Sequence, residues 1–219
     1  WLATEFPRRR WSLKVMHQLI MNSATYRQSS NVNKQHQKLD PENQLLSRMP
    51  LHKLDAEALR DSLIFVAGQL NENIRGGKPD GIMGHKDGLV SIPRGPSGWR
   101  RSLYVQQRRT QIPTFLTTFD LPRMEPNCIE RPQSTVAPQA LHLLNNKMIH
   151  DLSVAFAERV EQEVGTDREA QIERTFLLAL GRPPDREEWE VSNRYMDELV
   201  MKWQEEQPDA AAEASQQAL

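Results

Sequence analysis

Hydrophobic side chains recur every three or four residues over most of this chain, which is the spacing of one face of an α-helix. Ser12 is a suitable N-cap for a first helix over residues 13–22. The polar stretch 23–38 is expected to be irregular after its first turn. Asp40-Pro41 is then expected to begin a short helix, since proline suits the first helical position.

The clearest amphipathic pattern of the first half lies in residues 54–70, "LDAEALRDSLIFVAGQL". Its apolar positions are Ala56, Leu59, Leu63, Val66, Ala67 and Leu70. These positions follow one another at steps of one, three and four, so they share one face of a helix. The pattern therefore predicts a helix that packs this face against a core.

From residue 135 onward the pattern is helical again. Thr135 or Pro138 is expected to begin one helix, and a longer helix is expected over 148–164. Residues 166–169, "TDRE", form a capping box in front of a helix that ends at Gly181. Asp185 and Glu188 are then expected to cap a last helix, whose apolar stripe is Trp189, Met196, Leu199, Val200 and Trp203.

The middle of the chain lacks this periodicity. Residues 71–99 hold seven of the ten glycines and three prolines, so this tract is expected to be mobile or to be ordered only by a partner. Residues 101–107, "RSLYVQQ", are expected to form a short strand that pairs with 88–92. Residues 112–120 are expected to form one or two helical turns.

The predicted fold class is therefore mainly α, a multi-helix domain with a small irregular middle region that contains one short strand or hairpin. Four parts are predicted. They are an N-terminal helical part at 1–70, the Gly/Pro-rich and short-strand region at 71–134, C-terminal helices at 135–206, and a frayed tail at 207–219. Because the chain opens on Trp1 without an initiator methionine, it is expected to be a fragment of a longer protein.

Charge divides the chain unevenly. Residues 1–110 carry 18 Lys/Arg and 9 Asp/Glu, whereas residues 111–219 carry 10 Lys/Arg and 20 Asp/Glu. The basic and acidic halves either pack on each other or face different partners, for example an anionic polymer or polysaccharide. No nucleic-acid-binding motif accompanies the basic run at 7–11, so nucleic acid is not an expected partner. No apolar run is long enough to predict a membrane span.

Few residues invite a chemical interpretation. Cys128 is the only cysteine, so it forms no disulfide within the chain, and no signature of a catalytic cysteine surrounds it. A buried, unreactive thiol is therefore expected. The six histidines show no metal-ligand spacing, and the glycines between 76 and 84 lack the spacing of a phosphate-binding loop. No metal, cofactor or catalytic residue is predicted within the chain.

One polar cluster remains as a candidate site, composed of Arg101, Asp120, Cys128 and Arg131. Arginines forked onto carboxylates would form a polar network that fixes the irregular middle region. In that arrangement Arg131 reaches back to Asp120, and Cys128 fills a gap beneath it. The alternative is that the same residues form an anion or sugar site.

Several stretches together carry a family resemblance. They are "WSLKVMHQLIMNSATYRQSS", "LDAEALRDSL", "RRSLYV", "FDLPRMEPNCIERPQSTVAPQALHLLNN" and "LLALGRPPDREE", in this order. From Trp1 to about Glu188 the chain resembles the PSD family, a C-terminal domain of unknown function in large, secreted, cytochrome-c-bearing proteins of planctomycetes. The resemblance implies an exported, periplasmic or envelope-associated protein with upstream domains. It implies haem c only on such an upstream domain, since this chain has no C-x-x-C-H.

Two functional hypotheses follow. The first is a non-catalytic structural or interaction domain of a larger exported protein, with the upstream domains of the same polypeptide as partners. The second is an enzyme or carbohydrate-handling domain, whose site lies near the 71–99 loop and the segment Arg100–Arg131. An enzyme needs a concave site with converging titratable groups, whereas a docking domain exposes an apolar or aromatic surface.

Overall fold

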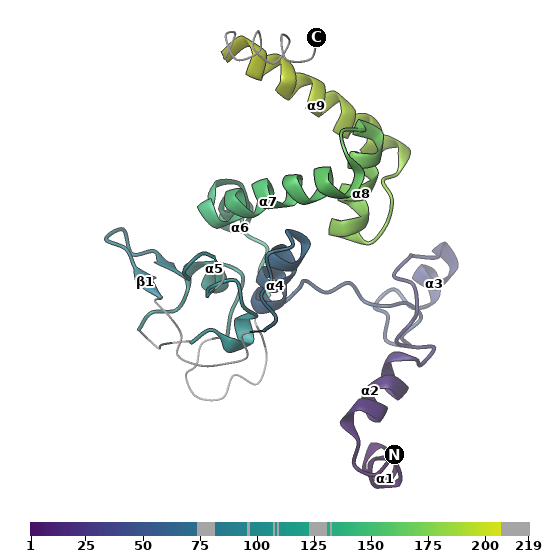
Figure 1. Cartoon of the computed structure of the whole chain (residues 1–219). Helices are drawn as coiled ribbons and strands as arrows, with labels where there is room; N and C mark the ends of the chain where they lie inside the picture. The colour runs from purple at the N-terminus through teal and green to yellow at the C-terminus, as the bar shows by residue number, and fades with distance from the viewer. Residues whose placement is uncertain are drawn as a thin grey trace. The chain divides into compact units, whose positions relative to one another are not determined.

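The computed structural model describes residues 1–73, 82–95, 97–106, 108, 110–122, 131 and 133–206. Its backbone contacts divide the chain into unit 1, Trp1–Lys53, and unit 2, Leu54–Leu219. The described residues contain nine α-helices, one 3₁₀ helix and one two-stranded antiparallel hairpin (Figure 1). This confirms the predicted fold class, which is mainly α with a small strand-containing region.

Unit 1 consists of three short helices, α1 (Leu2–Arg8), α2 (Leu13–Met21) and α3 (Lys34–Leu39). The Ser12 hydroxyl accepts a hydrogen bond from the Val15 backbone N–H, which confirms the predicted N-cap of α2. Between α1 and α2 the chain turns through two consecutive left-handed residues, Arg10 and Trp11. This turn brings the Trp11 ring edge-on to the ring of Phe6, with 5.2 Å between centroids.

The prediction for residues 23–45 was wrong in its placement of the helix. The short helix is α3, inside the stretch expected to be irregular, and Asp40 ends it. Asn33 caps α3 because its side-chain oxygen accepts the Gln35 backbone N–H. The Asp40 carboxylate instead accepts hydrogen bonds from the backbone N–H groups of Gln44 and Leu45. These bonds stabilise a turn rather than the start of a helix.

Unit 2 is built around α4 (Ala56–Val66), which contacts the 3₁₀ helix η1 (Ser102–Tyr104), α5 (Thr114–Thr118) and α7 (Lys147–Val164). The predicted apolar face of α4 does pack against these elements. The most buried positions, however, are Ala56, Arg60 and Ile64 with the following Ala67. An arginine therefore lies in the middle of the buried face, which the apolar pattern did not indicate.

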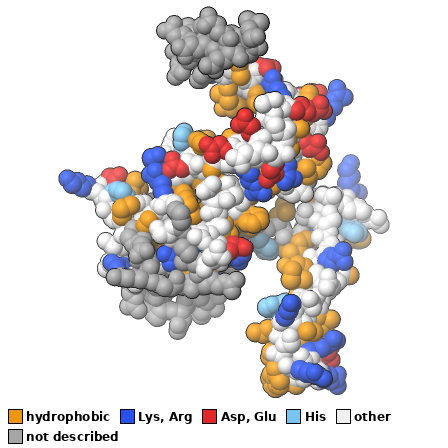
Figure 2. All heavy atoms as spheres, in the orientation of Figure 1, with side chains coloured by type: hydrophobic (Ala, Val, Ile, Leu, Met, Phe, Trp, Pro, Cys, Tyr) orange, Lys and Arg blue, Asp and Glu red, His pale blue; other side chains and the backbone are white. Residues whose placement is uncertain are grey.

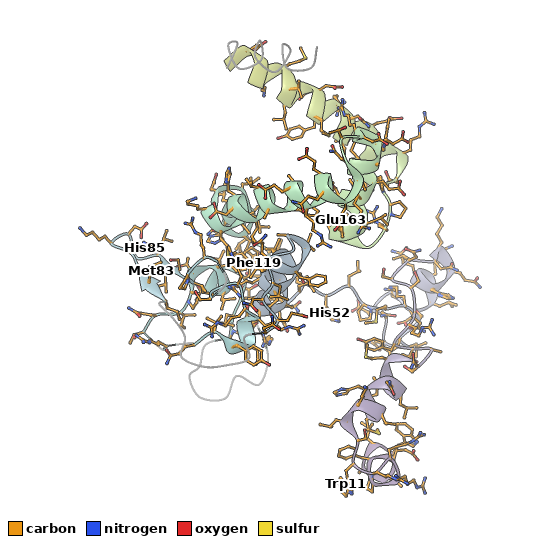
Figure 3. The ribbon with its side chains drawn as sticks, viewed as in Figure 1. Trp11, His52, Met83, His85, Phe119 and Glu163 are labelled. Carbon is orange, nitrogen blue, oxygen red and sulfur yellow. The ribbon has the colours of Figure 1, made fainter. Side chains whose placement is uncertain are left out.

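Two apolar clusters form the core of unit 2. The first contains Ala56, Phe115, Leu116 and Leu121, and the second contains Ile64, Ala67, Trp99 and Leu152. Figure 3 shows Phe119 among the side chains that gather around α4. The core thus joins α4 from the basic half of the chain to α5 and α7 from the acidic half. The ion pair between Arg94 and Asp151, 2.7 Å, also joins the two halves within unit 2.

The middle region differs from the prediction in two ways. Residues 102–104 form η1 rather than a strand, because Ser102 and its neighbours are held by hydrogen bonds to α4. The hairpin consists of β1 (Met83–Gly84) and β2 (Val90–Ser91), so 90–91 pairs with 83–84 and not with 101–107. Residues 82–95 and 97–99 form defined hydrogen bonds, and residues 74–81 and 96 lie outside the described residues. The expected mobility of 71–99 remains a prediction.

The C-terminal helices follow the sequence closely. They are α6 (Ala137–Asn145), α7, α8 (Arg168–Leu180) and α9 (Arg186–Glu206). Gly181 ends α8 in the left-handed conformation, as predicted. The N-cap of α8 is Asp167 rather than Thr166. Asp185 and Glu188 exchange reciprocal hydrogen bonds with each other's backbone N–H, which confirms the predicted capping box of α9. None of the described helices is long and apolar enough to cross a membrane.

Candidate functional site

Among the described residues of unit 2, the most buried polar side chain is that of Arg60, which is fully inaccessible to solvent. Its Nη1 donates to the backbone carbonyl of Arg100 at 2.9 Å and to the Ser102 hydroxyl at 3.2 Å. Its Nη2 donates to the backbone carbonyl of Gly98 at 2.7 Å. The guanidinium of α4 thus holds the turn 98–102 against the helix.

Asp61 completes this network from the next position of α4. Its Oδ1 accepts hydrogen bonds from the Ser102 backbone N–H at 2.8 Å and from the Ser102 hydroxyl at 2.7 Å. The same oxygen lies 3.6 Å from Nη1 of Arg60. Burial lowers the pKa of the Arg60 guanidinium to about 10, so it stays charged at neutral pH. The network therefore stabilises the packing of the turn 98–102 on α4.

The predicted cluster is distributed over separate contacts in the structure. Arg101 pairs with Glu72 at 2.9 Å, and both side chains are more than half exposed. Arg131 is forked onto Glu57 of α4, with Nη–Oε distances of 2.8 and 3.1 Å. The Arg131 hydrogen bond lowers the pKa of Glu57. Cys128 lies outside the described residues.

Asp120, the remaining member of the cluster, stabilises the start of α6. It sits in a left-handed conformation, φ 66°, and its carboxylate accepts the backbone N–H and the hydroxyl of Ser134, each at 2.7 Å. The buried amide of Gln139 donates to the Thr118 carbonyl, to Asp120 and to Ser134. This network joins α5 to α6 and gives Asp120 a structural role.

One contact resembles part of a catalytic dyad and was missed by the sequence analysis. On the β1–β2 hairpin, Nε2 of His85 lies 2.8 Å from the Ser91 hydroxyl. Figure 3 shows Met83 and His85 on this hairpin. The imidazole is exposed, and within the described residues no carboxylate hydrogen-bonds its Nδ1. A nucleophilic serine needs an oriented base and an oxyanion site. Of these requirements, the described hairpin supplies only the hydrogen bond between His85 and Ser91.

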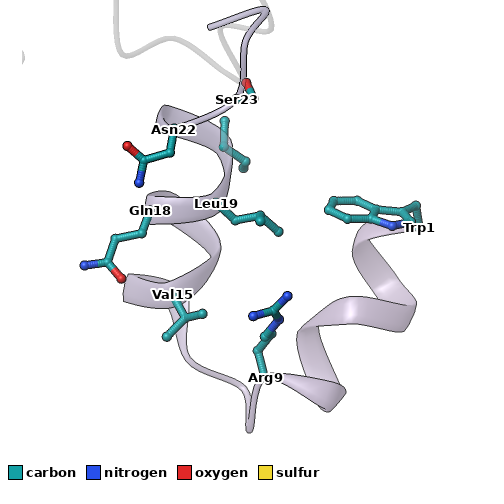
Figure 4. Close-up of a pocket in the computed structure, with 8 residues that line it drawn as sticks. Trp1, Arg9, Val15, Gln18, Leu19, Asn22 and Ser23 are labelled. Carbon is teal, nitrogen blue, oxygen red and sulfur yellow. The ribbon is translucent and has the colours of Figure 1, made fainter. Parts of the chain in front are cut away.

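The surface hollows lined by described residues include one in each unit. One, of about 530 Å³, is lined by residues 68–73 and Trp99, next to the Arg101–Glu72 pair. The other, of about 590 Å³, lies in unit 1 between α1 and α2 (Figure 4). Its walls include Trp1, Val15, Leu19 and Ile20, with Arg9 at one end. In Figure 4 the Trp1 ring extends toward the α2 side that carries Leu19.

The groove between α1 and α2 belongs to a unit without a core. All residues of unit 1 are described, and Met16 is its only buried apolar side chain. The large apolar side chains that unit 1 exposes include Trp1, Leu2, Trp11, Leu13, Ile20, Met21, Tyr26, Leu39, Leu45 and Leu51. Figure 2 shows hydrophobic and Lys/Arg side chains next to each other on the surface of this unit. Only the apolar spacing of 13–20 indicated this groove in the sequence.

No group of three or more potential ligands for a metal ion occurs among the described residues. In a scan of protein-family models, residues 1–196 match PSD1, described as a protein of unknown function (DUF1553). The match includes all of unit 1 and reaches into α9. No curated protein and no solved structure matches the chain.

Proposed function

Because this chain belongs to the PSD1 family of proteins of unknown function, we propose its role from its surface: it is a non-catalytic structural and interaction domain. Unit 2 is the folded scaffold, since α4, α5 and α7 share its core. Unit 1 is the docking element. The observation that carries this proposal is the absence of a core in unit 1, where only Met16 among the apolar residues is buried.

The energetic argument rests on the number of exposed side chains. Burying one large apolar side chain contributes about 1.5–3 kcal/mol. Trp1, Trp11, Leu39 and Leu51 are each at least two-thirds exposed, so unit 1 forgoes several such contributions. Scattered apolar residues are normal on a surface, but many of them on a segment of 53 residues mark an interaction site. A partner surface would supply the missing burial.

The proposed partners are the upstream domains of a larger polypeptide. The family resemblance supports an exported, periplasmic or envelope location and haem c on an upstream domain. In this proposal the chain itself binds no haem and docks beside the domain that does. Electron transfer then takes place on the partner, and this domain sets its position.

Hydrogen exchange tests the docking role. Amide exchange of residues 13–21 is measured in this chain alone and in the complete natural polypeptide, with residues 56–66 of α4 as the internal control. We expect α2 to exchange at least tenfold more slowly in the complete polypeptide, whereas the core helix α4 exchanges equally in both. Equal exchange of α2 in the two proteins would refute the docking role.

A second candidate function is carbohydrate handling, and the hollow beside Trp99 favours it. The side-chain amides of Gln69, Asn71 and Asn73 and the carboxylate of Glu72 are groups that recognise sugar hydroxyls. Affinity electrophoresis in gels that contain soluble polysaccharides tests this candidate. It requires retardation that is lost in Asn73→Ala; unretarded migration in neutral and anionic polysaccharides excludes it.

A further inference from the structure

The groove between α1 and α2 combines an apolar interior with basic surroundings. Its volume of about 590 Å³ is within the ~300–1,000 Å³ range of typical binding sites. Val15, Leu19 and Ile20 contribute apolar walls from α2, and Trp1 contributes another from the start of α1. Polar groups lie at the edge, from Gln18, Asn22 and Ser23. An apolar interior with a polar rim is the anatomy of an interface that buries side chains of a partner.

The charges around the groove have one dominant sign. Residues 1–23 contain four Lys/Arg, namely Arg8, Arg9, Arg10 and Lys14, and one acidic residue, Glu5. Glu5 is paired with Arg8 at 3.0 Å and with Arg9 at 3.4 Å. Arg10 and Lys14 form no ion pair within the described residues. The segment that forms the groove therefore carries a net positive charge, and Arg9 is the lining residue that contributes to it.

We propose that this groove receives an acidic amphipathic helix of a partner protein. The proposal rests on the docking role of unit 1 and names the chemistry of its partner. Apolar side chains at positions i, i+3 or i+4 and i+7 of such a helix enter the groove and pack on Leu19 and Ile20. Its carboxylates are attracted by the net positive charge of residues 1–23, which raises the association rate.

Two other occupants fit the observations less well. A second copy of unit 1 carries the same charge, since residues 1–53 contain nine Lys/Arg and three Asp/Glu, and would be repelled. An anionic bilayer also attracts basic segments that expose tryptophan. A bilayer surface is flat, however, and would leave the concave space between Trp1 and Leu19 unfilled. A helix with protruding side chains fills that space.

The test uses two fluorescein-labelled helical peptides with identical apolar positions, one with glutamate and the other with lysine at every polar position. Binding to this chain is followed by fluorescence anisotropy. We expect the acidic peptide to bind at least tenfold more tightly than the basic one, and its affinity to fall between 50 and 300 mM NaCl, a range chosen to shorten the Debye length. Equal binding of the two peptides, or no binding of the acidic one, would overturn the proposal.

A matched pair of variants locates the contact. Lys14→Glu reverses a charge in the first turn of α2, and Lys34→Glu makes the same change in the first turn of α3. A glutamate is favourable in the first turn of a helix, so both variants should fold. We expect Lys14→Glu to weaken binding of the acidic peptide at least fivefold and Lys34→Glu less than twofold. Equal losses would show that only the overall charge matters and would refute the groove.

An apolar variant and a lipid control complete the test. Ile20→Ser removes an apolar wall at an exposed position and should also weaken binding of the acidic peptide at least fivefold. Vesicles of phosphatidylglycerol and phosphatidylcholine should not displace the peptide; displacement would assign the surface to a membrane instead. If the acidic peptide fails to bind while α2 is still protected in the complete polypeptide, the docking role stands and only the partner chemistry is wrong.

Discussion

Replacing Arg60 with methionine tests the claim that a buried guanidinium holds the middle region of unit 2. Methionine is uncharged and about as long as the arginine stem up to Nε, so the apolar packing of the stem is largely retained. The substitution removes the donors to the carbonyls of Gly98 and Arg100 and to the Ser102 hydroxyl. These acceptors lie in a region that is closed to water, since Gly98, Arg100 and Ser102 are all buried.

Two opposing contributions set the loss of unfolding free energy in Arg60→Met: the hydrogen bonds that are removed, and the cost of burying the charge, which is relieved. A hydrogen bond from a charged donor contributes about 1.5–3 kcal/mol, so three of them contribute about 4–9 kcal/mol. The lowering of the Arg60 pKa from 12.5 to about 10, in which burial outweighs the attraction of Asp61, corresponds to a net cost of about 3–4 kcal/mol at ~1.4 kcal/mol per pH unit. The balance favours the native arginine, and Arg60→Met should lower the free energy of unfolding by about 3 kcal/mol. This agrees with the ~3–5 kcal/mol typical of removing one partner from a buried charged network.

Urea denaturation followed by circular dichroism measures this loss, with Arg101→Met as the matched control. Arg101 pairs with Glu72 at the surface, where such pairs contribute about 0–1 kcal/mol. A loss below about 1 kcal/mol in Arg60→Met, or a gain in stability, would show that desolvation outweighs the hydrogen bonds. In that case the buried guanidinium would destabilise the fold, and its role in holding the turn 98–102 against α4 would be refuted.

Three further predictions follow from single contacts. Gly98→Ala should destabilise unit 2 by several kcal/mol, because an added Cβ would lie 1.6 Å from the carbonyl oxygen of Pro93. An unchanged urea midpoint of the variant would contradict this. Arg182 lowers the pKa of Glu188 to about 2, so the start of α9 should keep its helicity from neutral pH to about 4 and lose it as the pH falls through 2. Circular dichroism should show this loss at higher pH in Arg182→Gln. Burial lowers the pKa of His142, so its contribution to stability should be full above about pH 6.5 and decline below it; His142→Gln should flatten the dependence of the urea midpoint between pH 7 and 5.

Local chemistry made the helix termini of the C-terminal part predictable from the sequence. The reciprocal cap of Asp185 and Glu188 and the left-handed Gly181 depend on residues within four positions of each other. The same holds for Ser12 at α2. The error at Asp40 has the same origin, because an aspartate that accepts backbone N–H groups serves a turn as well as a helix. Sequence specifies the cap, and the following residues decide whether a helix continues.

Apolar spacing also predicted that α4 packs against a core. The family resemblance identified from sequence motifs agrees with the PSD1 match for residues 1–196. The candidate cluster was harder to predict, because arginine and carboxylate side chains are long and pair across large separations in sequence. Arg131 lies 74 positions from its partner Glu57, and Asp120 lies 14 positions from Ser134. Nothing in the local pattern selects these pairs over the one expected between Arg131 and Asp120.

Residues 101–107 show most clearly what tertiary structure decided. Their run Leu103-Tyr104-Val105 contains residues that favour strands, but β-propensity is weak and depends on a neighbouring strand. Here the neighbour is α4. Its Asp61 accepts the backbone N–H and the hydroxyl of Ser102, and its Arg60 donates to the carbonyl of Arg100, just before this segment. The sequence by itself determined α2, α4 and the C-terminal helices, with the caps at Ser12, Gly181 and Asp185, because local contacts stabilise them. The conformation of the middle region was decided by a buried guanidinium some 40 residues away, because buried backbone groups take the hydrogen-bond partners that the packed core brings to them.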